Sequence, residues 1–403
     1  MNHPNRPLLL LICLVLLLPA VVFGQEKSID LKEAMELALK NNRKLKATAE
    51  KVAASKALAA AGFNIDKTQI YYRHDQNDIA ENGFSNKVFG ISQNMLFPTI
   101  YGKQKSVFKD MGAMEYQQYL VNQNQLKKEL SQTYYTIVYL NELANNYFFL
   151  DSLYQQFSKA ADRKFEVGET NYLEKLTAKS KKRELEVLLS QTRERKNQAY
   201  SKLAQLIQSS QDYRITEQKL TPLSLFASDW PHHPGVAYFE QAVGFRKNSL
   251  SLEKSKLLPD LHAEVYRGTN SGLNARVYPG VMVGISVPLW FGAQKAKISA
   301  SKYELSQAKF ELDNYTYQLE KKREQLEIEL KIYQESISFY NQEGKRLGQQ
   351  MLEQGNQSFQ NGEIDFFQFV VLLENSRSIT LDYLNNLQQY NMTVLEINYL
   401  TNP

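Results

Sequence analysis

The sequence predicts a mainly α-helical protein with a small β part, built from one unit of about 190 residues that occurs twice. Two short segments return in the same order at the same spacing. FEVGETNYL (165–173) reappears 194 residues later as FQNGEIDFF (359–367), and FGIS (89–92) reappears 194 residues later as VGIS (283–286). Proline is absent from 99–221 and from 289–402. Because a proline inside a helix costs about 3 kcal/mol, these stretches favour long helices.

Residues 1–24 have the pattern of a secretory signal peptide. Arg6 precedes an apolar run from Leu8 to Phe23, and about 15 apolar residues are few for a membrane span. A retained N-terminal anchor is the alternative. The single cysteine, Cys13, lies within this run, whereas a lipoprotein needs its cysteine where Gln25 stands. We therefore predict no lipid anchor, and no disulfide or thiolate metal site in the mature chain.

Charge and motifs argue against several classes of protein. The formal net charge is +5, and Lys and Arg alternate with Glu along the chain, so we expect no nucleic-acid partner. After residue 24 no apolar run reaches the length of a membrane-spanning helix, although β-barrel strands would leave only a weak hydropathy signal. The sequence shows no nucleophile motif, phosphate loop or zinc-ligand spacing. We expect no enzyme activity, no cofactor and no metal site, and we interpret His232 and His233 as a solvated linker pair.

Helical spacing accounts for most of the chain. A short N-terminal helix is predicted by Leu31, Ala38, Leu45, Val52 and Ala59. The first long arm, roughly Lys103 to Phe165, would be about 90 Å long. Its apolar positions are Leu126, Leu130, Tyr134, Ile137, Ala144 and Phe148. In the second half a coiled-coil seam of seven-residue steps comprises Ile298, Leu305, Leu312, Leu319, Leu326, Tyr333, Tyr340 and Leu347. Gly168 and Gly362 read as the left-handed turns of two helical hairpins.

Each half also contains a predicted β-hairpin. The first covers 67–97 around Asn82-Gly83, and the second covers 260–291. One face of the later strands is apolar: Phe89, Ile91, Met95 and Phe97 in the first half, and Val281, Val283, Ile285, Val287, Leu289 and Phe291 in the second. Small or polar residues such as Gly90, Ser92 and Ser286 occupy the other face. This alternation fits membrane strands, and a sheet that covers a soluble core is the alternative.

Four strands cannot close a barrel, and open sheet edges cannot lie in lipid. If the strands are membrane strands, copies of the chain must share one barrel, with 8 strands from two copies or 12 from three. We divide the mature chain into a first repeat, 25–220, and a second, 221–403. Gln104-Lys105 matches Gln294-Lys295 at a spacing of 190, which predicts insertions and deletions between the repeats.

The duplicated turns FEVGET and FQNGEI, with the junctions FGISQNMLFPTIYGKQK and VGISVPLWFGAQKAK, resemble the TolC family of outer-membrane efflux proteins. The resemblance implies a homotrimer with a 12-stranded barrel in outer-membrane lipid and a helical tunnel through the periplasm. It also implies two partners, a periplasmic adaptor (membrane fusion protein) and an inner-membrane resistance-nodulation-division pump. The second junction, NGEIDFFQF and EINYL are most similar to the heavy-metal CzcC/CusC-like branch, which implies metal cations as cargo.

Site residues follow from the same resemblance. The adaptor-docking tips would be Val167, Gly168, Glu169, Asn361, Gly362 and Glu363. The lipid-facing strand positions would be Phe89, Ile91, Met95, Val283, Ile285, Val287 and Leu289. Glu166 and Asp365 are candidates for an acidic aperture that favours cations. The plainer interpretation of tip acids such as Glu169 and Glu363 is that they stabilise helix N-termini. The alternative function is a periplasmic coiled-coil adaptor or scaffold without a barrel.

Overall fold

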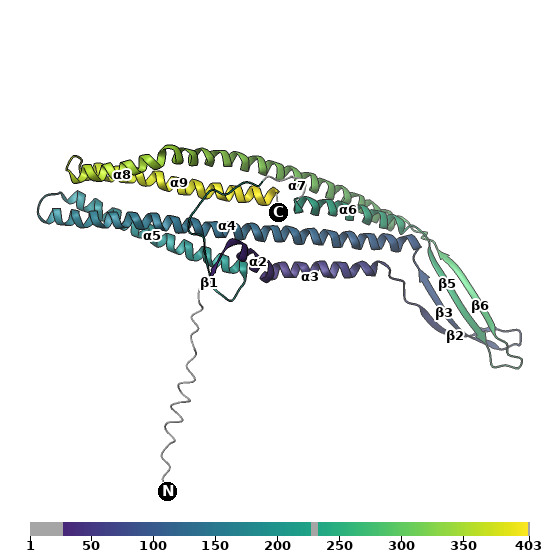
Figure 1. Cartoon of the computed structure of the whole chain (residues 1–403). Helices are drawn as coiled ribbons and strands as arrows, with labels where there is room; N and C mark the ends of the chain where they lie inside the picture. Colours follow the sequence, from purple (N-terminus) through teal and green to yellow (C-terminus); the bar gives the residue numbers. More distant parts are fainter. Residues whose placement is uncertain (1–26, 227–232, 402–403) are drawn as a thin grey trace, which may run out of the picture.

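The computed structural model describes residues 27–226 and 233–401 and shows an elongated, mostly helical molecule (Figure 1). Two long helical hairpins lie side by side, and a four-stranded sheet projects from one end. Both hairpin turns lie at the opposite end. The predicted fold class, long helical hairpins with a small β part, is confirmed.

The helices of the first half begin with two short ones and end with a long hairpin. They are α2 (Leu31–Asn41), α3 (Arg43–Leu58), the 3₁₀ turn η1 (Ala59–Gly62), α4 (Pro98–Glu166) and α5 (Tyr172–Ile207). With 69 residues, α4 is about 100 Å long. The predicted long arm therefore exists and extends beyond the predicted bounds at its N-terminal end.

In the described part of the second half, one helix, α6 (Pro234–Ser255), precedes the long hairpin. The first arm of that hairpin is divided into three elements, α7 (Gly292–Phe339), the π-helical turn η3 (Tyr340–Gly344) and α8 (Lys345–Gln360), and its second arm is α9 (Phe366–Thr401). Equivalent helix ends of the two long hairpins are separated by 194 residues. This holds for the starts of α4 and α7, for the ends of α4 and α8, and for both ends of α5 and α9. The predicted spacing of 190 is therefore wrong for the long hairpins. The predicted insertions and deletions do occur before them, since β2 and β5 begin 191 residues apart.

The predicted single N-terminal helix is divided in the structure. Asn42 adopts a non-helical backbone and caps α3, with its side-chain oxygen accepting a hydrogen bond from the Leu45 N–H at 3.0 Å. Its side-chain amide donates to the Leu206 carbonyl at 3.5 Å. Asparagine satisfies a helix start in this way because its short side chain reaches the free N–H groups of the first turn. The apolar spacing runs through this break and does not reveal it.

The sheet combines both β-hairpins in the order β2-β3-β5-β6. Its strands are β2 (Gln69–Ile79), β3 (Ser85–Met95), β5 (Asp260–Thr269) and β6 (Tyr278–Ser286), and all neighbours are antiparallel. Gly83 has a φ of 82° in the first turn, as the predicted Asn-Gly turn requires. The last strand ends at Ser286 and does not reach residue 291. Pro288 lies between the end of β6 and residue 291. Because proline has no N–H to donate to a strand ladder, the strand does not continue through it.

A separate two-stranded parallel ladder joins β1 (Lys27–Ile29) to β4 (Tyr213–Ile215). It lies against the main hydrophobic core, where Ile29 and Ile215 are buried. The ladder connects the start of the described chain to the segment that follows α5. The sequence does not predict this ladder, because strands of three residues give little periodic signal.

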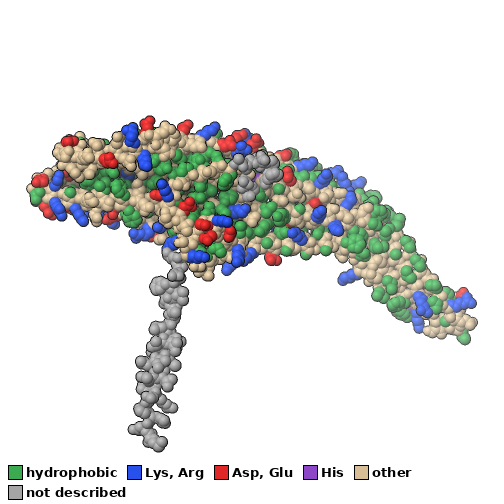
Figure 2. Space-filling model, in the orientation of Figure 1, with side chains coloured by type: hydrophobic (Ala, Val, Ile, Leu, Met, Phe, Trp, Pro, Cys, Tyr) green, Lys and Arg blue, Asp and Glu red, His purple; other side chains and the backbone are tan. Residues whose placement is uncertain are grey.

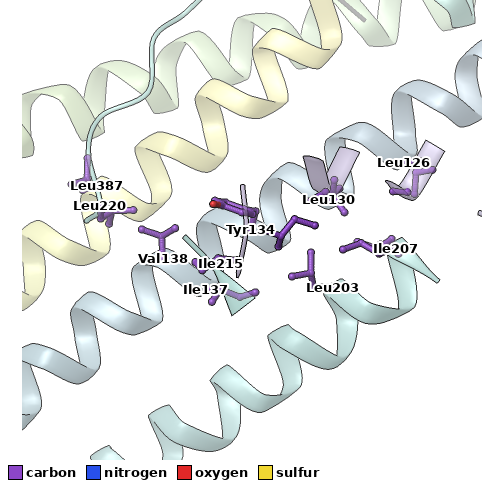
Figure 3. Packing of buried hydrophobic residues seen from close by; sticks show 14 of the residues in the cluster. Leu126, Leu130, Tyr134, Ile137, Val138, Leu203, Ile207, Ile215, Leu220 and Leu387 are labelled. Atoms are coloured by element: carbon purple, nitrogen blue, oxygen red, sulfur yellow. The ribbon is translucent and has the colours of Figure 1, made fainter. Parts of the chain in front are cut away.

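The largest core cluster is centred on α4 (Figure 3). Leu126, Leu130, Tyr134 and Ile137 are buried there as predicted, against Leu203 and other residues of α5. Further along α4 the prediction fails at Phe148, which is exposed. The buried positions are instead Leu143, Tyr147, Leu150 and Tyr154. A straight helix drifts relative to a seven-residue repeat, so the buried stripe moves around its surface.

The predicted seam runs through α7, η3 and α8, and all eight of its positions are buried or half-buried, as predicted. Within the described ranges, no helix combines the length and hydropathy needed to cross a membrane.

Candidate functional site

One face of the sheet is an exposed apolar band. Val283 is 78% exposed and Ile285 is 66% exposed, and Phe89 and Ile91 lie on the same face two strands away. Ile70, Tyr72, Val265 and Val281 extend the band across all four strands. Met95 shares this face and is half-buried. The structure therefore assembles the apolar strand positions into one surface (Figure 2).

Two of the predicted lipid-facing residues lie outside the strand. Val287 and Leu289 follow the end of β6, and both are exposed on the connection to α7. Trp290 in the same connection is 92% exposed. The prediction placed them in a strand by extending its alternation past Pro288. They lie where the sheet meets the helices.

The opposite face of the sheet is polar and hydrogen-bonded. The Tyr71 hydroxyl donates a hydrogen bond to Glu264, and His262 Nδ1 lies 2.7 Å from Asn94 Oδ1. Glycines make room for tyrosine rings on this face. A Cβ at Gly90 would lie 2.4 Å from the Tyr71 ring, and a Cβ at Gly280 would lie 2.1 Å from the Tyr266 ring. The two faces of the sheet therefore differ in polarity, although polar residues such as Arg267 and Gln93 lie on the apolar face and apolar residues such as Val88 and Met282 lie on the polar face.

The two hairpin tips have the same backbone structure. Gly168 and Gly362 have φ values of 78° and 75°. At each tip the glycine N–H bonds back to the carbonyl three residues earlier at 3.2 Å, and the next N–H bonds to the carbonyl five residues earlier at 2.8 Å. This is the Schellman arrangement that ends helices with a left-handed glycine. Val167, Glu169 and Asn361 are exposed around the two turns.

The acids at the tips have different local roles. Asp365 caps α9, because its carboxylate accepts a hydrogen bond from the Gln368 N–H at 2.8 Å. Glu363 accepts a bond from Ser358 Oγ at 2.8 Å, and Glu166 is the last residue of α4. In the first tip the cap is Asn171, which accepts from the Glu174 N–H at 3.0 Å. The interpretation of Glu169 and Glu363 as first-turn acids is wrong, because both precede the capping residue.

An aromatic cluster joins the two hairpins close to their tips. The rings of Phe157 and Phe369 are 4.7 Å apart, and those of Phe359 and Phe369 are 5.0 Å apart and stacked. Lys164 Nζ lies 5.5 Å from the centre of the Phe359 ring. Such contacts add to the area that the rings bury. They connect α4 directly to α8 and α9 and keep both tips together at one end of the molecule.

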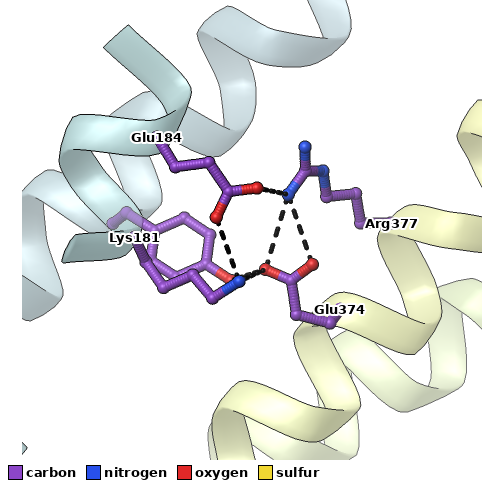
Figure 4. A network of polar contacts seen from close by, with 5 residues as sticks. Lys181, Glu184, Glu374 and Arg377 are labelled. Carbon is purple, nitrogen blue, oxygen red and sulfur yellow. Dashed lines mark hydrogen bonds and ion pairs between the residues drawn. The ribbon is translucent and has the colours of Figure 1, made fainter. Parts of the chain in front are cut away.

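A polar network lies farther from the tips, between α5 and α9 (Figure 4). Arg377, whose side chain is 10% exposed, contacts Glu374 at 3.2 Å and Glu184 at 3.7 Å. Lys181 contacts the same two carboxylates at 3.4 and 3.1 Å. The Tyr154 hydroxyl of α4 donates to Glu374 at 2.8 Å. Three helices of two hairpins therefore meet at one set of charges.

The network changes the acidity of its members. Burial and the hydrogen bond to Glu374 raise the pKa of Tyr154, so its phenol keeps its proton. Burial alone lowers the pKa of Lys181, but its bonds to Glu184 and Glu374 outweigh this effect and the pKa is raised. These residues cannot be predicted from the sequence, because the network joins positions almost two hundred residues apart and no local motif marks them.

Candidate metal ligands do not gather in the described part of the chain, where no group of three or more His, Cys, Asp and Glu side chains could hold an ion. His233 was interpreted as solvated, but it is half-buried and caps α6 by accepting a hydrogen bond from the Gly235 N–H at 3.0 Å. Burial lowers its pKa. His232 lies outside the described residues.

No family model matches the chain, and no curated protein matches its sequence. Solved structures do match its fold. A membrane protein from Pseudomonas aeruginosa has a TM-score of 0.77 at 12% identity, covering 95% of this chain and 97% of that one. CusC, a protein described as forming a transmembrane channel, has a TM-score of 0.76 at 14% identity, covering 95% and 96%.

The outer membrane protein VceC from Vibrio cholerae has a TM-score of 0.73 at 12% identity, covering 92% of this chain and 95% of that one. These similarities define the class of fold: the chain has the architecture of TolC-family outer-membrane channels over nearly its whole length. At such low identity the likeness establishes the fold alone. The heavy-metal branch stays a prediction.

Proposed function

We propose that this chain is the outer-membrane duct of a tripartite efflux system, which conducts cargo passively from an inner-membrane pump and a periplasmic adaptor to the exterior. One observation carries the proposal: the exposed apolar band covers one face of a sheet whose other face is polar. Membrane strands need this alternation, because one side meets lipid and the other meets water. The fold shared with outer-membrane channels supports the same interpretation.

The sheet also requires partner copies if it lies in lipid. Strands β2 and β6 are its two edges and pair with no further described strand. Each unpaired backbone group in hydrocarbon costs several kcal/mol, so the edges must join those of other copies. Three copies would give the 12 strands of the expected homotrimer.

A second surface of the protein is suited to neighbouring copies. Tyr303, Phe310 and Tyr317 are seven residues apart on α7, and all three are exposed. They form a stripe on the opposite side of α7 from its buried seam. A seven-residue stripe is what one helix presents to another in a coiled coil. We propose that this aromatic stripe packs against the adjacent copy.

The helical body then extends into the periplasm and presents the tips to the adaptor. In this arrangement Val167, Gly168 and Glu169, with Asn361, Gly362 and Glu363, are the docking residues. Heavy-metal cations are the proposed cargo, on the basis of the junction sequence that resembles the CzcC/CusC-like branch. The duct performs no catalytic step, and a conduit that holds its cargo weakly conducts it faster.

The test uses two adjacent residues on opposite faces of β6. Val283→Cys and Met282→Cys would each carry an environment-sensitive fluorophore, after reconstitution into vesicles that contain brominated phospholipid. We expect strong quenching at 283 and little at 282, because only position 283 lies in the apolar band. Equal quenching at both positions would contradict the barrel wall. Quenching at neither would instead favour the periplasmic adaptor or scaffold.

A further inference from the structure

Both α4 and α7 have several lysines close to their N-terminal ends. The first twelve residues of α4 (98–109) and of α7 (292–303) each contain three lysines and no acid. We call these six residues the basic collar: Lys103, Lys105, Lys109, Lys295, Lys297 and Lys302. Lys103 and Lys297 occupy equivalent positions of the two repeats, 194 residues apart. The feature is therefore present in both halves of the molecule.

The collar is distinguished by two helix starts of twelve residues that contain lysines and no acid. Helix N-termini favour acidic side chains because of the helix dipole, yet neither α4 nor α7 has an acid in its first turn. The absence of an acid from the first turn alone is shared with α3, α6, α8 and α9. Farther along α7 opposite charges alternate, as in the ion pairs Lys321–Glu324 at 2.9 Å and Arg323–Glu327 at 2.8 Å. A typical solvated helix face has that mixed pattern. The basic collar does not.

The lysines of the collar are largely free to meet a ligand. Lys103 is half-buried, with its Nζ 2.6 Å from Ser251 Oγ. The other five are exposed, and none forms an ion pair with a described residue. Two acids near the helix starts pair with cations outside the collar: Glu304 with Arg246 at 2.9 Å and Glu253 with Lys256 at 2.5 Å. Burial alone would raise the pKa of Glu253, but the bond to Lys256 and the nearby charge of Lys297 contribute to a net lowering. The charge of Asp110 is not offset by a cation, because its partner at 2.5 Å is the neutral amide of Asn248. The collar therefore presents net positive charge.

The collar borders the apolar band of the sheet. Contacts to α6 place the two helix starts at the same level, since Lys103 bonds to Ser251 and Gln294 bonds to the Glu253 carbonyl at 2.7 Å. Figure 2 shows Lys and Arg side chains gathered where the helical body meets the hydrophobic surface of the sheet. The exposed Trp290 lies between band and collar in the sequence. Tryptophan with lysine at the edge of an apolar band is the pattern of a membrane interface.

The distances suit a headgroup layer. Lys295 and Lys297 lie about 5–8 Å along the axis from the start of α7, and Lys302 lies about 15 Å along it. A bilayer has about 5–8 Å of polar headgroup region on each side of its hydrocarbon core. Lysine stems can also extend toward the interface while their ammonium groups remain in the polar layer. Lys103, Lys295 and Lys297 would thus lie at headgroup depth when the apolar band lies in hydrocarbon. Lys105, Lys109 and Lys302 would lie on the aqueous side of the headgroups, from where their side chains can extend toward them.

We infer that the basic collar binds the anionic headgroups of phospholipids in the leaflet that faces the helical body. The inference rests on the proposed function, because it needs the sheet to lie in the membrane. Lysines close to an anionic surface gain favourable electrostatic energy that falls off within a Debye length. The collar fixes the depth of the sheet and makes the protein prefer anionic over zwitterionic lipid.

The test compares two triple variants of equal charge. K295Q/K297Q/K302Q removes the α7 half of the collar, and K322Q/K331Q/K345Q removes three exposed lysines farther along the same arm. Each protein in detergent is mixed with phosphatidylglycerol or phosphatidylcholine and repurified, and bound phospholipid is measured as phosphorus per protein. We expect the collar variant to bind phosphatidylglycerol on the order of tenfold more weakly than the unmodified protein. The control variant should bind it normally.

A charge-retaining variant and the salt dependence complete the design. K295R/K297R/K302R should restore phosphatidylglycerol binding, and high salt should remove the difference between the glutamine variants. Equal retention of phosphatidylglycerol by both triple glutamine variants, with both proteins inserted in vesicles, would overturn the collar alone. If the unmodified protein fails to insert into vesicles, the proposed function fails and the collar proposal fails with it.

Discussion

The two long arms of the molecule are equal in length but differ in how many of their residues are buried. Arm one is α4, and arm two is α7, η3 and α8 together; each has 69 residues. Fifteen residues of arm one are buried, whereas arm two has eight: five in α7, one in η3 and two in α8. The reason is position: α4 packs against α5, α6, α3 and α9. Arm two leaves its aromatic stripe open, with Tyr303 at 75% and Phe310 at 71% exposed.

Duplication of the sequence therefore did not duplicate the packing of each copy. Arm one forms the core of the single chain, and arm two presents an exposed aromatic surface that, in the proposed function, packs against a neighbouring copy. Arm two also contains the π turn η3, whereas α4 is continuous. At η3 the rings of Tyr340 and Tyr383 stack at 3.8 Å. Turns of this kind insert an extra residue into a helix and often mark functional positions.

The largest expected effect is a difference between the two arms in how much a substitution lowers the free energy of unfolding. Leu130→Ala in arm one should lower the free energy of unfolding by about 2–5 kcal/mol, because Leu130 is fully buried and its removal leaves a cavity. Phe310→Ala in arm two should change the free energy of unfolding of the isolated chain by less than about 1 kcal/mol. Chemical denaturation followed by circular dichroism measures both. Similar losses in the two variants would contradict the contrast.

The second prediction concerns assembly. Replacing Tyr303, Phe310 and Tyr317 together by serine should dissociate the trimer while leaving the helical content unchanged. Each large side chain that is buried in an interface contributes about 1.5–3 kcal/mol. Light scattering of the detergent-solubilised protein measures its mass. Serine at Lys322, Lys331 and Lys345, which are exposed on the same arm, is the control, and a trimer that survives the stripe variant would place the interface elsewhere.

The third prediction compares the two tips. Gly168→Val and Gly362→Val should cost about 1–2 kcal/mol locally, because both glycines are left-handed. No described atom would clash with the added Cβ, so trimer and barrel should remain intact while efflux falls. The double variant should be worse than either single one. Cysteine at Glu169 or Glu363 would capture an adaptor by crosslinking. Capture only by cysteines far from the tips would show that docking occurs elsewhere.

The smallest expected effect is a pH dependence of arm one. Burial and the nearby Glu217 raise the pKa of Tyr135 to about 12, above the value of about 10 in an unfolded chain. Stability from the protonated phenol is therefore present below pH 10 and is lost between pH 10 and 12. Because the ring is partly exposed, we expect a loss of about 1 kcal/mol. In the Tyr135→Phe variant the melting temperature should therefore fall less between pH 10 and 12 than in the unmodified protein. Tyr116→Phe, at an exposed position, is the control and should show the same fall as the unmodified protein.

Much of this fold could be predicted from sequence because long helices repeat their signal over many turns. The tips, the hairpins and the seam of α7 depend on glycine and on apolar spacing, which are local. The break at Asn42 was missed because the spacing continues through it. The strand end at Ser286 was missed because alternation continued past Pro288. Phe148 was misplaced because burial on α4 depends on which helices surround it.

Candidate sites divide in the same way. The apolar strand positions and the tip glycines could be predicted, since each follows from a short pattern. The network of Lys181, Glu184, Glu374 and Arg377 could not, because its charges come from two hairpins and resemble ordinary surface charges in sequence. The order of strands in the sheet could not be predicted from the sequence either. It depends on β3 pairing with β5 across the two repeats.

The glycines beneath the tyrosine rings of the sheet have a consequence for the width of the pore. Tyr71 lies over Gly90 and Tyr266 lies over Gly280, so both rings occupy space that a side chain would otherwise fill. In the closed barrel proposed above, the inner wall would then be thinner at these places. The bore of such a barrel depends on strand number and also on whether its side chains lie flat. Alanine at either glycine would displace a phenol ring inward and narrow the route for cargo without changing a single strand.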